Sequence, residues 1–231
     1  MPDSGASRTL ALDAVAASQP TALAKMPPIQ RSAKKRKLYE MKGSLRRAPG
    51  GWKLMNSSAV FPGGGQIYLT PKDRRGFPEY AATPVLRFDG KLGQDLKDMD
   101  WTGDYWLVSD QAKTVLEQVD PDAFAFQACR VELRNGSEGP RYWLCDVVRV
   151  LDALNEPESE AKIRKNDRGE KVYNMIGNEL LIFKEDVIGP HHIFRMRYRE
   201  PNVICDAAMM DACKAAGLKG WSFRDTSRHA F

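Results

Sequence analysis

Three aspartates, Asp110, Asp146 and Asp206, each follow a short apolar segment and precede residues with the apolar spacing of a helix. Three carboxylates at comparable positions could form a catalytic or metal-binding cluster. A carboxylate at such a position also accepts hydrogen bonds from the first free N–H groups of a helix, which contributes about 1 kcal/mol of stability without any chemical role. We therefore interpret the three aspartates as helix N-caps and predict a helix after each.

The histidines and cysteines offer little further chemistry. His191 and His192 are adjacent, so on a strand they would point to opposite faces rather than toward one metal ion. The four cysteines form no C-x-x-C pair, and we expect them to be reduced and mostly buried. We predict no catalytic residue, no cofactor and no metal site. An enzyme alternative would use Cys145 or Cys205 as a thiol of lowered pKa at a helix N-terminus, with one of these histidines as its base.

One acidic segment is a candidate for binding a partner protein. Asp95, Asp98, Asp100 and Asp104 surround Trp101 in a predicted loop. An acidic surface with an aromatic anchor is typical of contacts with cationic partners. The alternative is a solvated loop whose Trp101 side chain packs into the core. A second candidate is the charged segment 155–170, which has few apolar residues and the composition of a long mobile loop.

The elements that would position these residues belong to an α+β fold. Residues 43–92 are dense in Gly and Pro, which leaves room for short strands such as 66–69 and 83–88 in an irregular, strand-rich N-terminal half. Apolar spacing at three and four residues after position 104 predicts about three capped helices, packed on a mixed sheet, in the C-terminal half.

The ends of the last predicted helix and two late strands complete this fold. The third helix should start at Asp206 and end at Gly217, with Leu218 folding back on its last turn and a final strand containing Trp221 and Phe223. In residues 193–198 arginines alternate with apolar residues, which predicts a half-exposed strand with an arginine-bearing outer face.

Charge is distributed unevenly along the chain. Residues 1–47 hold 10 Lys or Arg and 3 Asp or Glu, for a net charge of +7, whereas the remainder holds 25 and 27, for −2. We predict a disordered basic tail over residues 1–36 and one domain over 37–231, with possible sub-lobes 37–100 and 101–231. The sequence lacks an apolar run of about 18 residues and a compact signal peptide, so we expect a cytoplasmic protein that is not embedded in a membrane.

Several motifs together resemble a known family. Four segments resemble a bacterial polymorphic-toxin immunity family, the eleventh in the numbered series of such families. They are 105–110 (YWLVSD), 119–124 (VDPDAF), 142–147 (YWLCDV) and 183–189 (FKEDVIG). The likeness spans roughly residues 52–223. The resemblance implies an α+β protein that binds and neutralises a secreted toxin inside the producing cell, and it implies no reaction.

A nucleic-acid-associated protein is the main alternative. It would use the basic residues 34–37, Arg46 and Arg47 as phosphate contacts. It predicts strongly salt-dependent binding to DNA or RNA that is lost when the tail is deleted.

Overall fold

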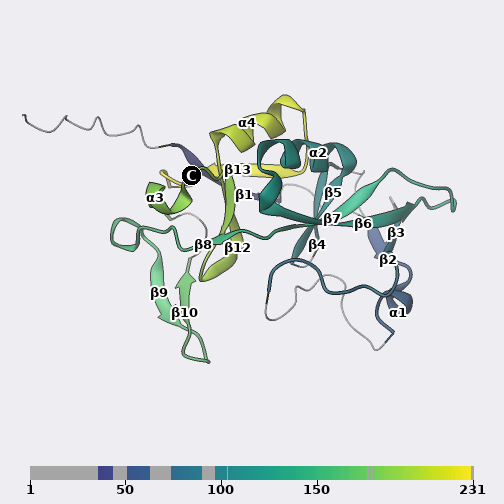
Figure 1. Ribbon diagram of the computed structural model, residues 1–231, viewed down its shortest axis with the longest axis horizontal. Coiled ribbons are helices and arrows are strands. Elements are labelled where there is room, and N and C mark those ends of the chain that lie inside the picture. The colour runs from purple at the N-terminus through teal and green to yellow at the C-terminus, as the bar shows by residue number, and fades with distance from the viewer. Residues whose placement is uncertain are drawn as a thin grey trace, which may run out of the picture. The chain divides into compact units, whose positions relative to one another are not determined.

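Two mixed sheets organise the chain (Figure 1). This computed structural model describes residues 36–43, 51–62, 74–89, 97–102, 104–175, 177 and 179–229. Lys35–Phe231 forms one compact unit, and its fold is α+β, as predicted. Of the predicted tail the structure describes Arg36, and the predicted strand 66–69 lies outside the described residues. The division into a tail and one domain stays a prediction.

The larger sheet has six strands in the order β2-β3-β6-β7-β5-β4. β3 and β6 run parallel, and the other neighbours are antiparallel. β3 confirms most of the strand predicted at 83–88. The strands are β2 (Trp52–Leu54), β3 (Val85–Phe88), β4 (Met99–Thr102), β5 (Tyr105–Ser109), β6 (Phe124–Glu132) and β7 (Tyr142–Val147).

The second sheet has five strands in the order β13-β1-β12-β11-β8. It joins the first described strand of the chain to the last, because β1 lies between β12 and β13. The predicted final strand is confirmed as β13. The strands are β1 (Leu38–Gly43), β8 (Val150–Leu151), β11 (Ile193–Met196), β12 (Arg199–Asp206) and β13 (Trp221–Asp225).

A separate hairpin is formed by β9 (Lys162–Lys165) and β10 (Lys171–Asn174). It belongs to neither large sheet, and Figure 1 shows it projecting from them. We predicted a long mobile loop over residues 155–170, and this prediction is wrong. The side chain of Asn166 accepts hydrogen bonds from the N–H groups of Arg168 and Glu170, which closes a tight turn between the two strands.

The helices are short, and two of them are capped by side chains. The helical segments are α1 (Ser57–Val60), α2 (Asp110–Val119), α3 (Glu185–Ile188) and α4 (Ala207–Ala215), with 3-10 turns η1 (Pro121–Ala123) and η2 (Glu156–Glu158). Asp206 caps α4 by accepting a hydrogen bond from the N–H of Met209, as predicted. The cap of α2 is Ser109, whose hydroxyl accepts from the N–H of Ala112, so the predicted cap at Asp110 is wrong by one residue.

The end of α4 follows its prediction. Gly217 has a φ of 68°, a left-handed conformation that costs glycine little. The N–H of Leu218 donates to the carbonyl of Cys213, and the N–H of Gly217 donates to that of Lys214. These two bonds satisfy carbonyl groups that the last turn of the helix leaves free.

The helix predicted after Asp146 does not exist. Asp146 lies within β7, and residues 148–154 run from the six-stranded sheet to β8 of the five-stranded sheet. Val147, Val148 and Val150 are β-branched and favour extended backbone. The apolar residues of this connection have helix-like spacing because its two ends pack in different clusters, Val147 in one and Ala153 and Leu154 in another. Apolar residues are therefore needed on more than one side.

The strand predicted at 193–198 exists as β11 over residues 193–196, but its predicted half-exposure is wrong. All four residues of β11 are buried, because this strand lies between β12 and β8, and residues 197 and 198 form a turn. Arg195 is only 4% exposed. At Arg195 the polar position of the alternation is therefore a buried charged contact rather than part of a solvated face, whereas Arg197 is exposed.

Three apolar clusters form the core. The first lies beneath α2 and α4, which are in contact, and it includes Trp106 of β5 and Val203 of β12. These helices thus cover strands of both large sheets (Figure 1). The second cluster packs Phe194 and Ile204 of the five-stranded sheet with Tyr173 of the hairpin. The third covers the six-stranded sheet around Leu107 and its neighbours.

Candidate functional site

The acidic segment predicted to bind a partner is only partly described. Asp95 and the Trp101 side chain lie outside the described structure. The predicted loop is wrong for part of this segment, because Met99–Thr102 form β4 and the backbone of Trp101 pairs with Trp106 of β5. Asp98 accepts hydrogen bonds from the Ser109 hydroxyl at 2.9 Å and from the N–H of Lys219 at 2.8 Å. This carboxylate therefore joins the start of α2 to the loop after α4.

The other two acidic residues differ in exposure. The Asp100 carboxylate accepts a hydrogen bond from the indole N–H of Trp52 at 3.2 Å, and it is partly buried. Asp104 is exposed, and its backbone carbonyl accepts from Arg195 at 3.4 Å. Asp98 and Asp100 thus have structural roles inside the fold, and Asp104 is the described carboxylate of this segment that solvent reaches most fully. Their role in binding stays a prediction.

Asp146 forms a buried ion-pair cluster that sequence reasoning missed. Its side chain is fully buried, and it pairs with Arg75 and with Arg195, the latter at 3.0 Å. The N–H of Gly76 donates to the same carboxylate at 2.7 Å. Arg195 also donates to the carbonyl groups of Val147 and Glu200, both at 2.8 Å. Because Asp146 belongs to β7 and Arg195 to β11, the pair connects the two large sheets.

The electrostatics of this cluster oppose a catalytic role for it. Burial lowers the pKa of Arg195, and the nearby charge of Arg75 lowers it further, while Asp146 raises it. Burial also disfavours the charged form of Tyr105, and it therefore raises the pKa of this residue. The Tyr105 hydroxyl donates a hydrogen bond to the carbonyl of Gly76. A carboxylate held by two arginines and an N–H group has no spare acceptor for a substrate, so the cluster is a structural contact.

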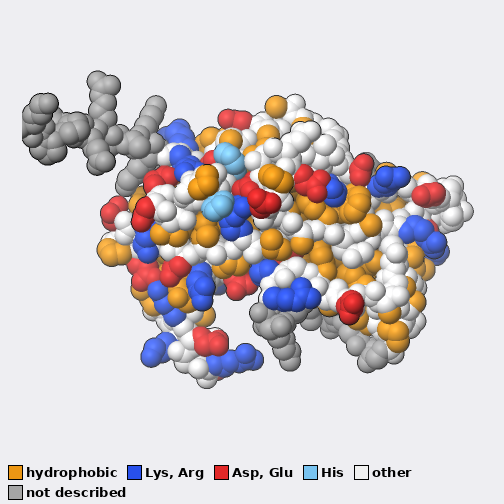
Figure 2. Space-filling view, viewed as in Figure 1, with side chains coloured by type: hydrophobic (Ala, Val, Ile, Leu, Met, Phe, Trp, Pro, Cys, Tyr) orange, Lys and Arg blue, Asp and Glu red, His pale blue; other side chains and the backbone are white. Residues whose placement is uncertain are grey.

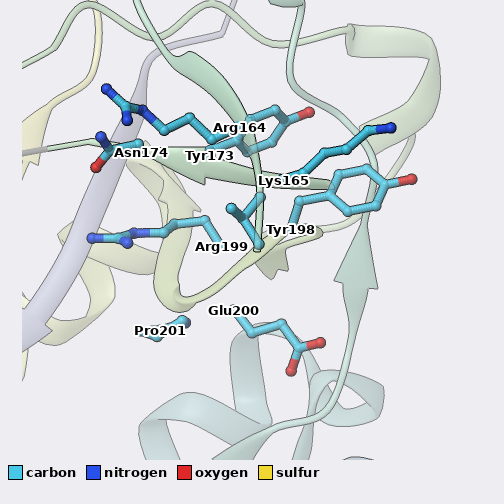
Figure 3. Close-up of a pocket in the computed structure, with 9 residues that line it drawn as sticks. Arg164, Lys165, Tyr173, Asn174, Tyr198, Arg199, Glu200 and Pro201 are labelled. Carbon is cyan, nitrogen blue, oxygen red and sulfur yellow. The ribbon is translucent and has the colours of Figure 1, made fainter. Parts of the chain in front are cut away.

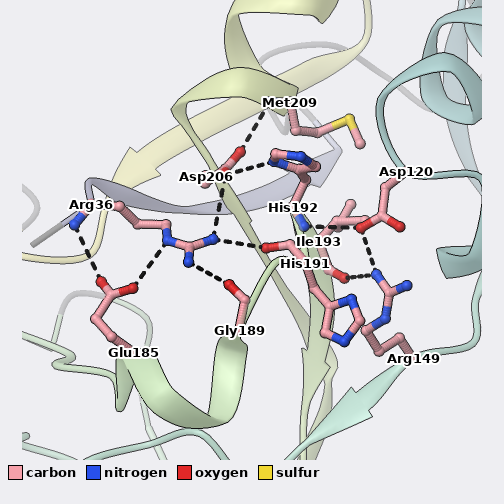
Figure 4. A network of polar contacts seen from close by, with 10 residues as sticks. All are labelled: Arg36, Asp120, Arg149, Glu185, Gly189, His191, His192, Ile193, Asp206 and Met209. Atoms are coloured by element: carbon pink, nitrogen blue, oxygen red, sulfur yellow. Dashed lines mark hydrogen bonds and ion pairs between the residues drawn. The ribbon is translucent and has the colours of Figure 1, made fainter.

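A second polar network surrounds Arg36 (Figure 4). Its guanidinium pairs with Glu185 at 3.0 Å and donates to the carbonyl groups of Gly189 and His191 at 2.5 and 3.0 Å. It also lies 3.7 Å from a carboxylate oxygen of Asp206. One residue of the basic run that the nucleic-acid alternative requires is therefore already engaged by a carboxylate of the same chain.

The histidines of this network have structural neighbours. The Nδ1 atom of the His192 ring lies 2.8 Å from the Asp206 carboxylate, and the backbone N–H of His192 donates to Asp120 at 2.9 Å (Figure 4). Asp120 also accepts from Arg149 at 2.5 Å. Burial raises the pKa of Asp120, but the hydrogen bonds from Arg149 and His192 outweigh it and hold this pKa below its ordinary value.

The cysteines do not fit the enzyme alternative. All four are free and buried. Cys145 lies in a strand rather than at a helix N-terminus, and burial raises its pKa well above the ordinary value. Burial does the same for Cys205. Because the thiolate is the reactive form, these raised pKa values contradict the lowered pKa that the enzyme alternative requires.

The β9–β10 hairpin carries a group of exposed basic side chains. Every residue of β9 is exposed, and Ile163 is 52% exposed. Residues 162–171 contain five Lys or Arg and two Asp or Glu. Figure 2 shows blue side chains on this part of the molecule, at the lower left. Among the described residues, no ion pair involves Lys162, Arg164, Lys165 or Arg168.

The base of the hairpin is fixed to the fold. Tyr173 is 1% exposed, its N–H donates to the carbonyl of Tyr198 at 3.0 Å, and its hydroxyl donates to Glu156 at 2.6 Å. Lys171 pairs with Glu156 and lies 4.5 Å from the centre of the Tyr198 ring. Hydrogen bonds from Lys171 and Tyr173 lower the pKa of Glu156, which keeps the carboxylate charged.

An open pocket of 420 Å³ lies between the hairpin and the start of β12. Arg164 and Tyr173 line it from the hairpin, and Tyr198 and Arg199 line it from the other side. Figure 3 shows the side chains of Arg164 and Arg199 pointing one way and the two tyrosine rings pointing the other. The alternation in residues 162–165 and the turn formers of 166–169 were the sequence signals that could have identified this hairpin.

The sequence comparisons agree with the motifs. The chain matches the Immunity protein family (Imm11) over residues 27–228, which is most of its length. It therefore belongs to this immunity protein family, as the resemblance of its motifs predicted. No match was found among curated proteins. Within the described residues, every helix is too short or too polar to cross a membrane.

Proposed function

We propose that this protein binds a cognate bacterial polymorphic toxin in the cytoplasm of the cell that makes both, and neutralises it by contact without catalysing a reaction. The observation that carries this proposal is the match to an immunity protein family over residues 27–228. The raised pKa values of Cys145 and Cys205 support a binding role rather than thiol chemistry.

The experiment pairs a growth assay with a binding assay. The chain is co-expressed with the toxin encoded by the adjacent upstream gene, and it is also titrated against a catalytically inactive form of that toxin. We expect restored growth and a one-to-one complex. A toxin that still kills and does not bind the folded protein would contradict the proposal, and binding to duplex DNA or RNA instead would favour the nucleic-acid alternative.

The acidic segment is proposed as one contact surface. Asp104→Lys is the suitable variant, because Asp104 is exposed whereas Asp98 and Asp100 hold internal hydrogen bonds. Opposite charges across an interface steer association, so this reversal should slow binding of a cationic toxin. An association rate equal to that of the unsubstituted protein would exclude Asp104 from the interface.

A further inference from the structure

The β9–β10 hairpin has the shape of a docking element. Its two strands pair only with each other in the described structure, and the outer edge of β9 is fully exposed. A two-stranded hairpin is marginally stable alone. Here the buried Tyr173 and its bond to Tyr198 hold it in place. The arrangement presents an accessible strand whose backbone is already paired, which lowers the ordering cost of binding.

Its charges lack partners within the protein. We define the basic hairpin surface as Lys162, Ile163, Arg164, Lys165 and Arg168. The four basic members form no ion pair with a described carboxylate. By contrast Lys171, at the base of the same hairpin, pairs with Glu156. Four unpaired cations on one projecting element are complementary to an acidic surface, and they would steer such a surface toward the hairpin.

The apolar content of this surface distinguishes a protein partner from a nucleic acid. Ile163 is 52% exposed between basic neighbours, and an exposed branched aliphatic side chain gains little against a phosphate backbone. Arg164 and Tyr198 both line the pocket, and arginine and tyrosine are residue types enriched where binding energy concentrates in protein interfaces.

We propose that the basic hairpin surface, with the adjoining pocket, binds an acidic surface of the partner toxin. This inference rests on the proposed function. A carboxylate of the toxin would enter the pocket beside Arg164 and Arg199, and Ile163 would be covered at the edge of the contact. The acidic segment reaches the same region, because Arg195 donates both to the carbonyl of Glu200, which lines the pocket, and to that of Asp104. The two surfaces are therefore tested by different substitutions, in β9 and at Asp104.

The test compares two double charge reversals that change the net charge equally. Lys162→Glu with Arg164→Glu alters the hairpin, and Lys53→Glu with Arg134→Glu alters two exposed basic residues elsewhere, one in β2 and one in the turn after β6. Each is titrated against catalytically inactive toxin, and circular dichroism spectra and melting curves establish that both variants fold. We expect the hairpin variant to bind at least about 30-fold more weakly, and the control to stay within about threefold of the original affinity.

The outcomes separate this inference from the proposed function. If the unsubstituted protein binds the toxin and both variants bind it equally well, the hairpin is not the interface and the proposed function stands. If the unsubstituted protein does not bind the toxin, the proposed function and this inference are both contradicted. If the hairpin variant keeps its toxin affinity but loses affinity for a fluorescent 20-nucleotide RNA or DNA, the surface serves nucleic acid and the inference is overturned.

A second variant tests the apolar part of the surface. Ile163→Ser removes the exposed side chain without changing charge, and it should raise the dissociation rate with little effect on the association rate. The charge reversal should instead lower the association rate and weaken its dependence on salt. Unchanged dissociation in Ile163→Ser would show that the side chain is not covered in the complex.

Discussion

The buried cluster around Asp146 gives the sharpest prediction about stability. The Asp146→Asn variant keeps the volume of the side chain and removes its charge, which leaves Arg195 buried without a counter-ion. Removing one partner of a buried ion pair costs about 3–5 kcal/mol. The backbone N–H of Gly76 would also face the side-chain amide of the variant, which accepts a hydrogen bond only through its oxygen and not through its nitrogen. We therefore expect Asp146→Asn to lower the free energy of unfolding by about 3–5 kcal/mol.

The measurement is urea denaturation followed by circular dichroism and tryptophan fluorescence. Arg195→Met should also be costly, since it removes one of the two arginines that pair with the buried Asp146. The double variant should lose less stability than the sum of the two single losses, because neither charge is then buried alone. Glu132→Gln is a matched control, since its pairs with Arg87 and Arg130 are at the surface, where ion pairs contribute little to stability.

Two results would refute this reasoning. A loss below about 1 kcal/mol in Asp146→Asn would mean that water reaches Arg195 and solvates it. Strict additivity in the double variant would mean that the two side chains stabilise the fold independently. Either result would remove the argument that the Asp146–Arg195 pair connects the two sheets.

Two further predictions concern titration and reactivity. Because the folded-state pKa of Asp120 lies below its ordinary value of 3.8, its contribution to stability is present above that pH and is lost as the pH falls through the folded-state pKa. Asp120→Asn should flatten the acid limb of the stability curve, and an unchanged limb would contradict the assignment. Burial raises the pKa of Cys129 to about 12 and that of Cys213 to about 11, so iodoacetamide should modify the cysteines slowly until urea unfolds the chain. Mass spectrometry would detect rapid modification of the folded protein, which would contradict this prediction.

Local sequence patterns predicted some helix ends correctly but could not separate caps from buried ion pairs. Asp110, Asp146 and Asp206 look alike in sequence, since each follows a short apolar strand. The structure gives them three different roles. Asp206 caps α4, Asp110 is the first residue of a helix capped by Ser109, and Asp146 binds Arg75 and Arg195. The last role depends on residues 71 and 49 positions away, which no local pattern contains.

The same limit explains the error at residues 193–198. Alternation with period two identified a strand correctly, but it could not show whether the polar positions face solvent or a buried counter-ion. Arg195 is compatible with burial only because Asp146 lies beside it. The family could be predicted from the sequence because several short motifs, each ambiguous alone, agreed with one another. A surface that binds a partner protein has no comparable local pattern.

The hairpin shows why net charge was a poor guide to the partner. Outside the first 47 residues the chain has a net charge of −2, which favoured an acidic contact surface and a cationic toxin. A net charge does not specify where charges lie or which of them are already paired. In the structure Asp98 and Asp100 hold internal hydrogen bonds, whereas the basic side chains of β9 have no described ion-pair partner. At the hairpin the charge without an ion-pair partner is therefore positive, which supports the proposed contact with an acidic surface of the toxin and leaves the proposed contact at Asp104 to its own test.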